Sequence, residues 1–77
     1  MADNFDLLRD LEAKAEAAYD SMYDAETPRG AAGCYSDAKD AYSEAIGLAQ
    51  RLGAEGDVAR LVARFAHVQA VYRSQFA

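Results

Sequence analysis

Apolar side chains recur at intervals of three and four residues along nearly the whole chain, in three successive stretches. The clearest stretch contains Val58, Leu61, Phe65, Val68, Tyr72 and Phe76, with Val62 at its edge. Side chains at that spacing lie along one face of an α-helix, which must then be buried against another element. The pattern therefore predicts an all-α fold.

Two earlier stretches carry the same pattern. Their apolar positions are Phe5, Leu8, Leu11, Ala15, Tyr19 and Met22, and then Ala31, Tyr35, Ala38, Tyr42, Ala45, Ala49 and Leu52, with Ile46 widening the second stripe. We predict helices over residues 4–24, 28–52 and 57–75, antiparallel in succession, as a three-helix bundle in a single domain over residues 1–77. The residues expected to be buried together are Leu8, Leu11, Ala15, Tyr42, Ala45, Leu61, Phe65, Val68 and Tyr72, with Phe65 the most central.

The start of the second helix is the least defined boundary. Thr27 followed by Pro28 suits an N-cap and a first helical turn, whereas Gly30 and Gly33 would each cost about 1 kcal/mol inside a helix. We place the start near Pro28, with a weak first turn, and expect Gly53 to end the helix. The capping candidates for the other two helices are Asp3 or Asn4, and Asp57.

The charges are distributed unevenly along the chain, whose formal net charge is −5. Residues 1–26 carry eight acidic side chains against two basic ones, whereas residues 54–77 carry three arginines against two acidic side chains. An acidic first helix beside a basic last helix indicates attraction within the bundle and, secondarily, a partner surface. The net negative charge argues against binding to nucleic acid or to an anionic membrane, because both require clustered Lys and Arg.

The cellular compartment follows from the cysteine content and the N-terminus. Cys34 is the only cysteine, so it has no partner for an internal disulfide. The first residues lack the basic and apolar regions of a signal peptide, and no apolar run reaches the roughly 20 residues that cross a bilayer. We therefore expect a cytoplasmic protein.

The residue types that carry chemistry are few. His67 is the only histidine, and it is expected on the exposed face opposite Phe65, without a nucleophile and carboxylate, or further Cys and His ligands, at useful spacing. The most economical interpretation of Cys34 is a partly buried spacer. The glycine pairs lack the lysine and hydroxyl residue of a phosphate loop. We expect no enzymatic activity, no cofactor and no metal site.

The pattern Tyr35, Ala38, Tyr42, Ala45 and Ile46 resembles the second helix of a tetratricopeptide repeat, which places an aromatic residue, an alanine, an aromatic residue, and an alanine beside a large aliphatic residue. The continuation through residues 58–76 is similar to the first helix of a following repeat. The resemblance covers residues 35–76 and implies a helix hairpin plus a third helix, with a groove that receives peptides. On the last helix the groove positions would be Ala63, Ala66, Ala70, Arg73 and Ser74.

The residues themselves independently indicate a ridge of small side chains on the last helix, formed by Ala59, Ala63, Ala66 and Ala70. Small side chains allow another backbone to come close, and that backbone can belong to a peptide, to a second copy, or to the first helix of the same domain. The leading hypothesis is a non-enzymatic protein-protein interaction module. The alternative is a structural, self-associating bundle that forms a homodimer.

Overall fold

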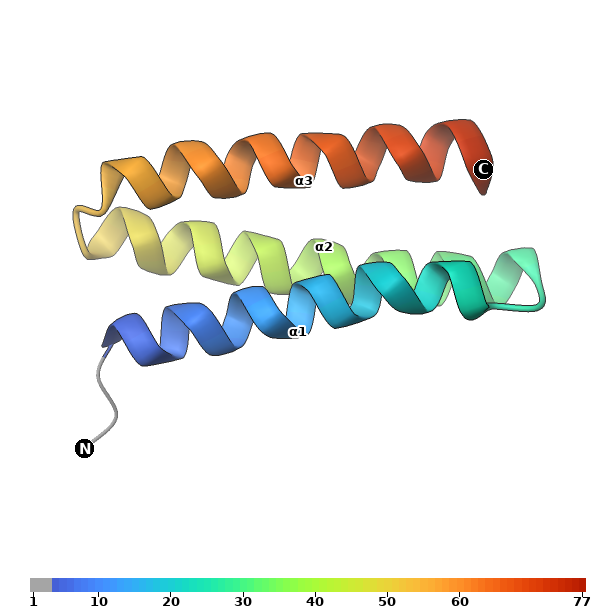
Figure 1. Ribbon diagram of the computed structural model, residues 1–77, viewed down its shortest axis with the longest axis horizontal. Helices are drawn as coiled ribbons and strands as arrows, with labels where there is room; N and C mark the ends of the chain where they lie inside the picture. Colours follow the sequence, from blue (N-terminus) through green and yellow to red (C-terminus); the bar gives the residue numbers. More distant parts are fainter. Residues whose placement is uncertain (1–3) are drawn as a thin grey trace.

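The chain folds into three α-helices, and the computed structural model describes residues 4–77. Helix α1 spans Asn4–Asp24, α2 spans Pro28–Arg51 and α3 spans Glu55–Gln75. They run antiparallel in succession, with α2 between α1 and α3 (Figure 1). The described residues contain no strand. The predicted all-α, three-helix architecture is thus confirmed, and the predicted boundaries are correct to within two residues.

The turn before α2 is capped as the sequence predicted. Thr27 has an extended backbone, and its side-chain oxygen Oγ1 accepts a hydrogen bond of 3.0 Å from the backbone N–H of Gly30. Pro28 occupies the first turn, where its missing N–H is not needed. At the other end of α2, Gly53 has a φ of +69°, the left-handed conformation that favours glycine and ends a helix.

The predicted cap of α3 is wrong. The N-cap is Ala54, which makes no side-chain capping hydrogen bond, and Asp57 lies inside the first turn. Because the chain reverses sharply at Gly53, the helix begins at once, and the Val58 N–H already bonds to the Ala54 carbonyl at 3.0 Å. Asp57 still favours the helix through its charge near the N-terminal end. Asn4 is the first residue of α1, and the other candidate cap, Asp3, lies outside the described residues.

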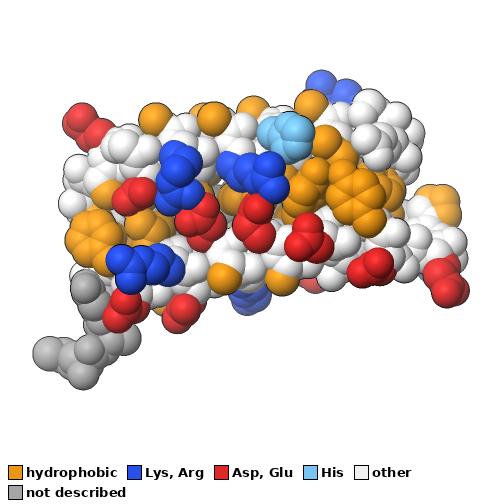
Figure 2. Space-filling view, in the orientation of Figure 1, with side chains coloured by type: hydrophobic (Ala, Val, Ile, Leu, Met, Phe, Trp, Pro, Cys, Tyr) orange, Lys and Arg blue, Asp and Glu red, His pale blue; other side chains and the backbone are white. Residues whose placement is uncertain are grey.

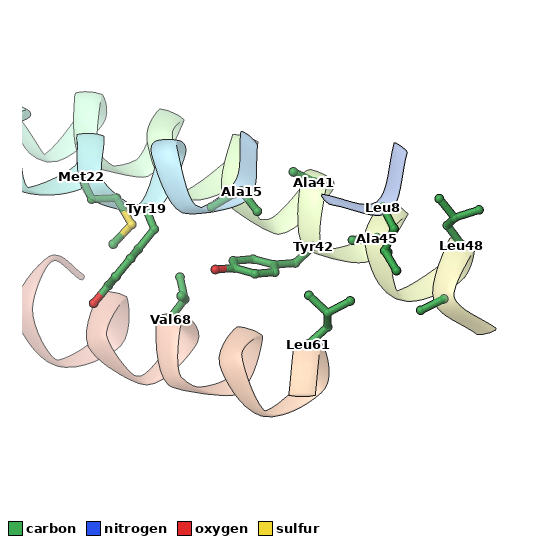
Figure 3. Close-up of a cluster of buried hydrophobic side chains, with 12 residues drawn as sticks. Leu8, Ala15, Tyr19, Met22, Ala41, Tyr42, Ala45, Leu48, Leu61 and Val68 are labelled. Atoms are coloured by element: carbon green, nitrogen blue, oxygen red, sulfur yellow. The ribbon is translucent and has the colours of Figure 1, made fainter. Parts of the chain in front are cut away.

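Helices α1 and α2 pack through alanines. Ala15 of α1 and Ala38, Ala41 and Ala45 of α2 are all buried. Larger residues, including Leu8 and Met22, fill the interface on either side of them (Figure 3). This pair of helices makes the most extensive contact in the bundle, because small side chains let the two backbones approach closely.

Helices α2 and α3 pack through larger side chains. Tyr42 projects from α2 toward Leu61 and Val68 of α3, and all three are fully buried (Figure 3). The Tyr42 ring also stacks on Phe65, with centroids 5.6 Å apart and planes 15° apart. Nearer the open end of this pair, Tyr35 stacks on Tyr72 with a centroid distance of 4.1 Å.

Three of the nine predicted core residues, Leu11, Phe65 and Tyr72, are only partly buried. The reason is the shape of the bundle, whose Cα extents are 39 × 24 × 13 Å. Because the bundle is flat, α1 and α3 are covered by α2 on one side and approach each other least (Figure 1). None of the helices in residues 4–77 is long and apolar enough to cross a membrane.

Candidate functional site

Helix α3 is apolar on two opposite sides. Leu61 and Val68 face the core, and the opposite side presents exposed small and apolar residues. We call this side the outer face of α3, made of Ala59, Val62, Ala63, Ala66, Ala70, Arg73 and Ser74. A surface helix normally carries polar side chains opposite the core. In the outer face only the last two residues are polar.

The five positions predicted to bind a partner all lie on this face. Ala63, Ala66, Ala70, Arg73 and Ser74 are exposed, so they make no buried contact with α1. The hypothesis that the alanine ridge packs on the first helix of the same domain is therefore wrong. The physical reason is the helical register: these residues lie on the side of α3 turned away from the core.

The side of α3 that does meet α1 is charged. Arg64 binds Glu16 of α1 through two hydrogen bonds, 3.0 Å from Nε and 2.8 Å from Nη2. The Tyr42 hydroxyl donates a hydrogen bond to the same carboxylate, so one Glu16 joins all three helices. The hydrogen bond to Glu16 raises the pKa of the Arg64 guanidinium. This contact confirms the predicted attraction between an acidic α1 and a basic α3.

A second arginine repeats the contact one turn earlier on α3. Arg60 pairs with Glu12 of α1 and, at 3.1 Å, with Asp57 of its own helix. Its pKa is raised, first by the hydrogen bond to Glu12 and then by the one to Asp57. Figure 2 shows these basic and acidic side chains meeting between α1 and α3. The α1–α3 side is therefore bridged by ion pairs.

An aromatic cluster joins the other ends of α1 and α3. Tyr19 and Tyr23 meet edge to face, and their hydroxyls are 2.9 Å apart. The His67 ring is exposed, as predicted, and meets the Tyr19 ring edge to face with the ring centroids 6.3 Å apart. The Phe76 ring meets the Tyr23 ring in the same way, with a centroid distance of 5.4 Å. The hydrogen bond with Tyr23, followed by burial, raises the pKa of the Tyr19 hydroxyl. This cluster was not predicted from the sequence, although Tyr19 and Tyr23 are one helical turn apart.

An open hollow of about 340 Å³ lies beside the outer face, where α2 ends and α3 begins. It is lined by Ala49, Gln50, Gly53, Glu55, Val58 and Ala59. Most of its surface is apolar, and Glu55 supplies an acidic edge. The hollow depends on how the chain turns at Gly53, so the periodicity of the sequence did not predict it.

Within residues 4–77, no group of three His, Cys, Asp or Glu side chains is placed to hold a metal ion. Cys34 is partly buried beside the core, in keeping with the interpretation of a spacer.

A second hollow, between α1 and α2, has a charged rim formed by Lys14, Asp37, Asp40 and Glu44. The outer face of α3 is the more distinctive surface, because its exposed side chains are mostly apolar.

No family model matches this chain, and neither the curated proteins nor the solved structures contain a match to it. The tetratricopeptide-like resemblance of residues 35–76 therefore stays a prediction.

Proposed function

We propose that this chain is a cytoplasmic, non-enzymatic interaction module of tetratricopeptide-like type, which binds another protein through the outer face of α3. The observation that carries the proposal is the exposure of five apolar side chains on the side of α3 opposite the core. Leaving an apolar helix face in water is unfavourable, and its burial against a partner would release that water.

The shape of the outer face supports a helical partner. Alanines at positions 59, 63, 66 and 70 follow one another at intervals of four, three and four residues. Such a row has no long side chains to hold a second helix away, so two backbones can approach closely. The α2–α3 hairpin is also consistent with a helical repeat, in which each unit packs on its neighbours.

The test places two negative charges on the row. Ala66→Glu combined with Ala70→Glu should leave the monomer helical, because alanine and glutamate have similar helix propensities and both positions are exposed. A matched control is Ala13→Glu with Ala17→Glu, which makes the same charge change at the same spacing on the exposed side of α1.

Immobilised wild-type protein should retain a partner from a lysate of its source that the Ala66→Glu, Ala70→Glu variant loses and the control keeps. Circular dichroism verifies that both variants are folded. A folded Ala66→Glu, Ala70→Glu variant that retains the same proteins as wild type would contradict the proposal.

The alternative function is that of a structural bundle that associates with itself through the same face. It is favoured by the modest size of the core, because a chain of 77 residues buries a smaller share of its surface than a larger domain.

A further inference from the structure

Opposite charges lie at the two ends of α3, in line with its outer face. Glu55 is in the first turn and Arg73 in the last, at the same angular position around the helix. Both are exposed, and neither has an ion-pair partner among residues 4–77. They are 18 residues apart, which corresponds to about 27 Å along the helix axis.

The residues between these charges are arranged symmetrically. The stripe consists of Gly56, Ala59, Ala63, Ala66, Ala70 and Arg73. Its steps of three, four, three, four and three residues average 3.4, close to the spacing of about 3.5 in a coiled-coil seam. Read from either end, the steps come in the same order, so the stripe has a centre between residues 64 and 65. A second copy turned by 180° about that centre places the four alanines of one stripe opposite the four alanines of the other.

We propose that the partner of the outer face is a second copy of this chain, bound antiparallel along α3. In this register Ala63 meets the partner's Ala66, Ala59 meets the partner's Ala70, and Glu55 lies beside the partner's Arg73. The two-fold axis produces each contact twice, so both ends of the seam gain an ion pair. A parallel arrangement would instead place Glu55 beside the partner's Glu55, with repulsion at both ends.

The surface around Glu55 has room for the partner's arginine. Gly56 has no Cβ, and nothing lies within 4 Å of the position where a Cβ would be. The apolar hollow opens next to it, lined by Val58, Ala59 and the end of α2. The aliphatic part of an arginine side chain packs well on such a surface while its guanidinium reaches a carboxylate. The hollow thus fits the end of the partner's α3.

The seam is short and made of small residues. A seam of about 27 Å lined by small side chains buries less surface than a standard interface, which buries about 800 Å² on each partner. We therefore expect a weak dimer. This inference rests on the proposed function, because it uses the same face, and it develops the self-associating alternative by naming a second copy as the partner.

Sedimentation velocity of the full chain, from about 10 µM to about 1 mM, should show a reversible monomer–dimer equilibrium. The Glu55→Arg and Arg73→Glu variants should each raise the dimer Kd about tenfold, because each places like charges together at both ends. Combining the two substitutions should return the Kd close to the wild-type value. Reciprocal rescue of this kind requires that the two residues meet across the dimer.

Two controls separate this pairing from general effects of charge. Lys39→Glu makes the same charge change as Arg73→Glu, and Glu44→Arg the same change as Glu55→Arg, both at exposed positions of α2 that do not line the hollow. Neither should alter the Kd. Circular dichroism of every variant checks that helicity is kept, since Glu55 and Arg73 also favour the α3 dipole.

A cross-linking experiment tests the direction of the helices. In a Cys34→Ser background, a mixture of Ala59→Cys and Ala70→Cys chains should form a disulfide-linked dimer on oxidation. Ala59→Cys chains alone should not, because an antiparallel register separates the two copies of that residue by about 16 Å, beyond the reach of a disulfide. Efficient cross-linking of Ala59→Cys alone would overturn the antiparallel arrangement.

The failure of this inference differs from the failure of the proposed function. Suppose that the wild-type chain stays monomeric at every concentration, and that the Ala66→Glu, Ala70→Glu variant no longer retains a lysate partner that wild type retains. That result would overturn the proposal of a second copy as partner and leave the proposed function in place. If the chain dimerises but neither Glu55→Arg nor Arg73→Glu changes the dimer Kd, the proposed register is overturned. Unchanged retention and unchanged sedimentation in the Ala66→Glu, Ala70→Glu variant overturn both.

Discussion

The two sides of α2 are packed by different means. Toward α1 it presents small residues, including Ala38, Ala41 and Ala45, and the two helices share the larger contact. Toward α3 it presents the rings of Tyr35 and Tyr42, and the contact is smaller. The alanine interface is closed, whereas the aromatic interface leaves the edges of several rings partly exposed.

This difference explains the flat shape of the molecule. Bulky rings hold α3 on α2 without drawing it over α1, so the α1–α3 gap is spanned by the longer side chains of Glu16, Arg64 and Tyr19. The Arg64 guanidinium, 5.1 Å from the centre of the Tyr19 ring, both pairs with the carboxylate and covers the ring. Polar and cation–π contacts thus complete a core that apolar packing alone does not close.

The largest expected effect is at the residue on which the aromatic interface is centred. Tyr42→Ala should lower the free energy of unfolding by about 3–5 kcal/mol, because it empties a fully buried ring position. The whole stability expected for a chain of this length is about 4–11 kcal/mol. Phe65→Ala, expected from the sequence to be the most harmful change, should cost less, since Phe65 is partly exposed. Urea denaturation followed by circular dichroism measures both.

Tyr42→Phe is the control for the hydroxyl group. It keeps the ring and removes the hydrogen bond to the Glu16 carboxylate, so it should cost less, about 1.5–3 kcal/mol. If Phe65→Ala proved more destabilising than Tyr42→Ala, the aromatic interface would be centred on α3 and this comparison of interfaces would be incorrect.

The second prediction concerns the alanine interface. Ala45→Leu should destabilise the fold by about 1–3 kcal/mol, because the close approach of α1 and α2 leaves no room for added methylene and methyl groups. Ala17→Leu makes the same change at an exposed position of α1 and should lie within about 0.5 kcal/mol of wild type. Thermal unfolding curves compare the two variants. Equal midpoints would show that the α1–α2 spacing is adjustable.

The sequence predicted the features that depend on local periodicity and capping. Three apolar stripes predicted the positions of the helices, and Thr27 and Gly53 predicted the two ends of α2. The opposite charges of the first and last helices predicted the attraction between them. Burial was predicted less well, because the stripe containing Phe65 and Tyr72 does not reveal how far α3 is displaced from α1. That displacement results from the contrast between alanine and aromatic packing on α2, a tertiary property.

The candidate site was predicted in part. The alanine row could be recognised from its helical spacing. Whether it faced α1 or solvent depended on which of the two apolar sides of α3 is buried in the core. Leu61 and Val68 occupy the core because larger apolar side chains gain more from burial than alanine does. The hollow beside Glu55 required the path of the backbone at Gly53, which the sequence indicates only as a turn.

The smallest expected effect is at the polar bridge between α1 and α3. In a double-mutant cycle of Glu16→Gln and Arg64→Met, the coupling free energy should be about 0.2–1 kcal/mol. Both side chains remain more than a third exposed, so water screens the pair despite its two hydrogen bonds. In about 1 M salt, where the screening length is about 3 Å, the coupling should fall toward zero. A salt-independent coupling above about 2 kcal/mol would mean that the bridge is effectively desolvated, and that charge, more than the packing of Tyr42, holds α3 in place.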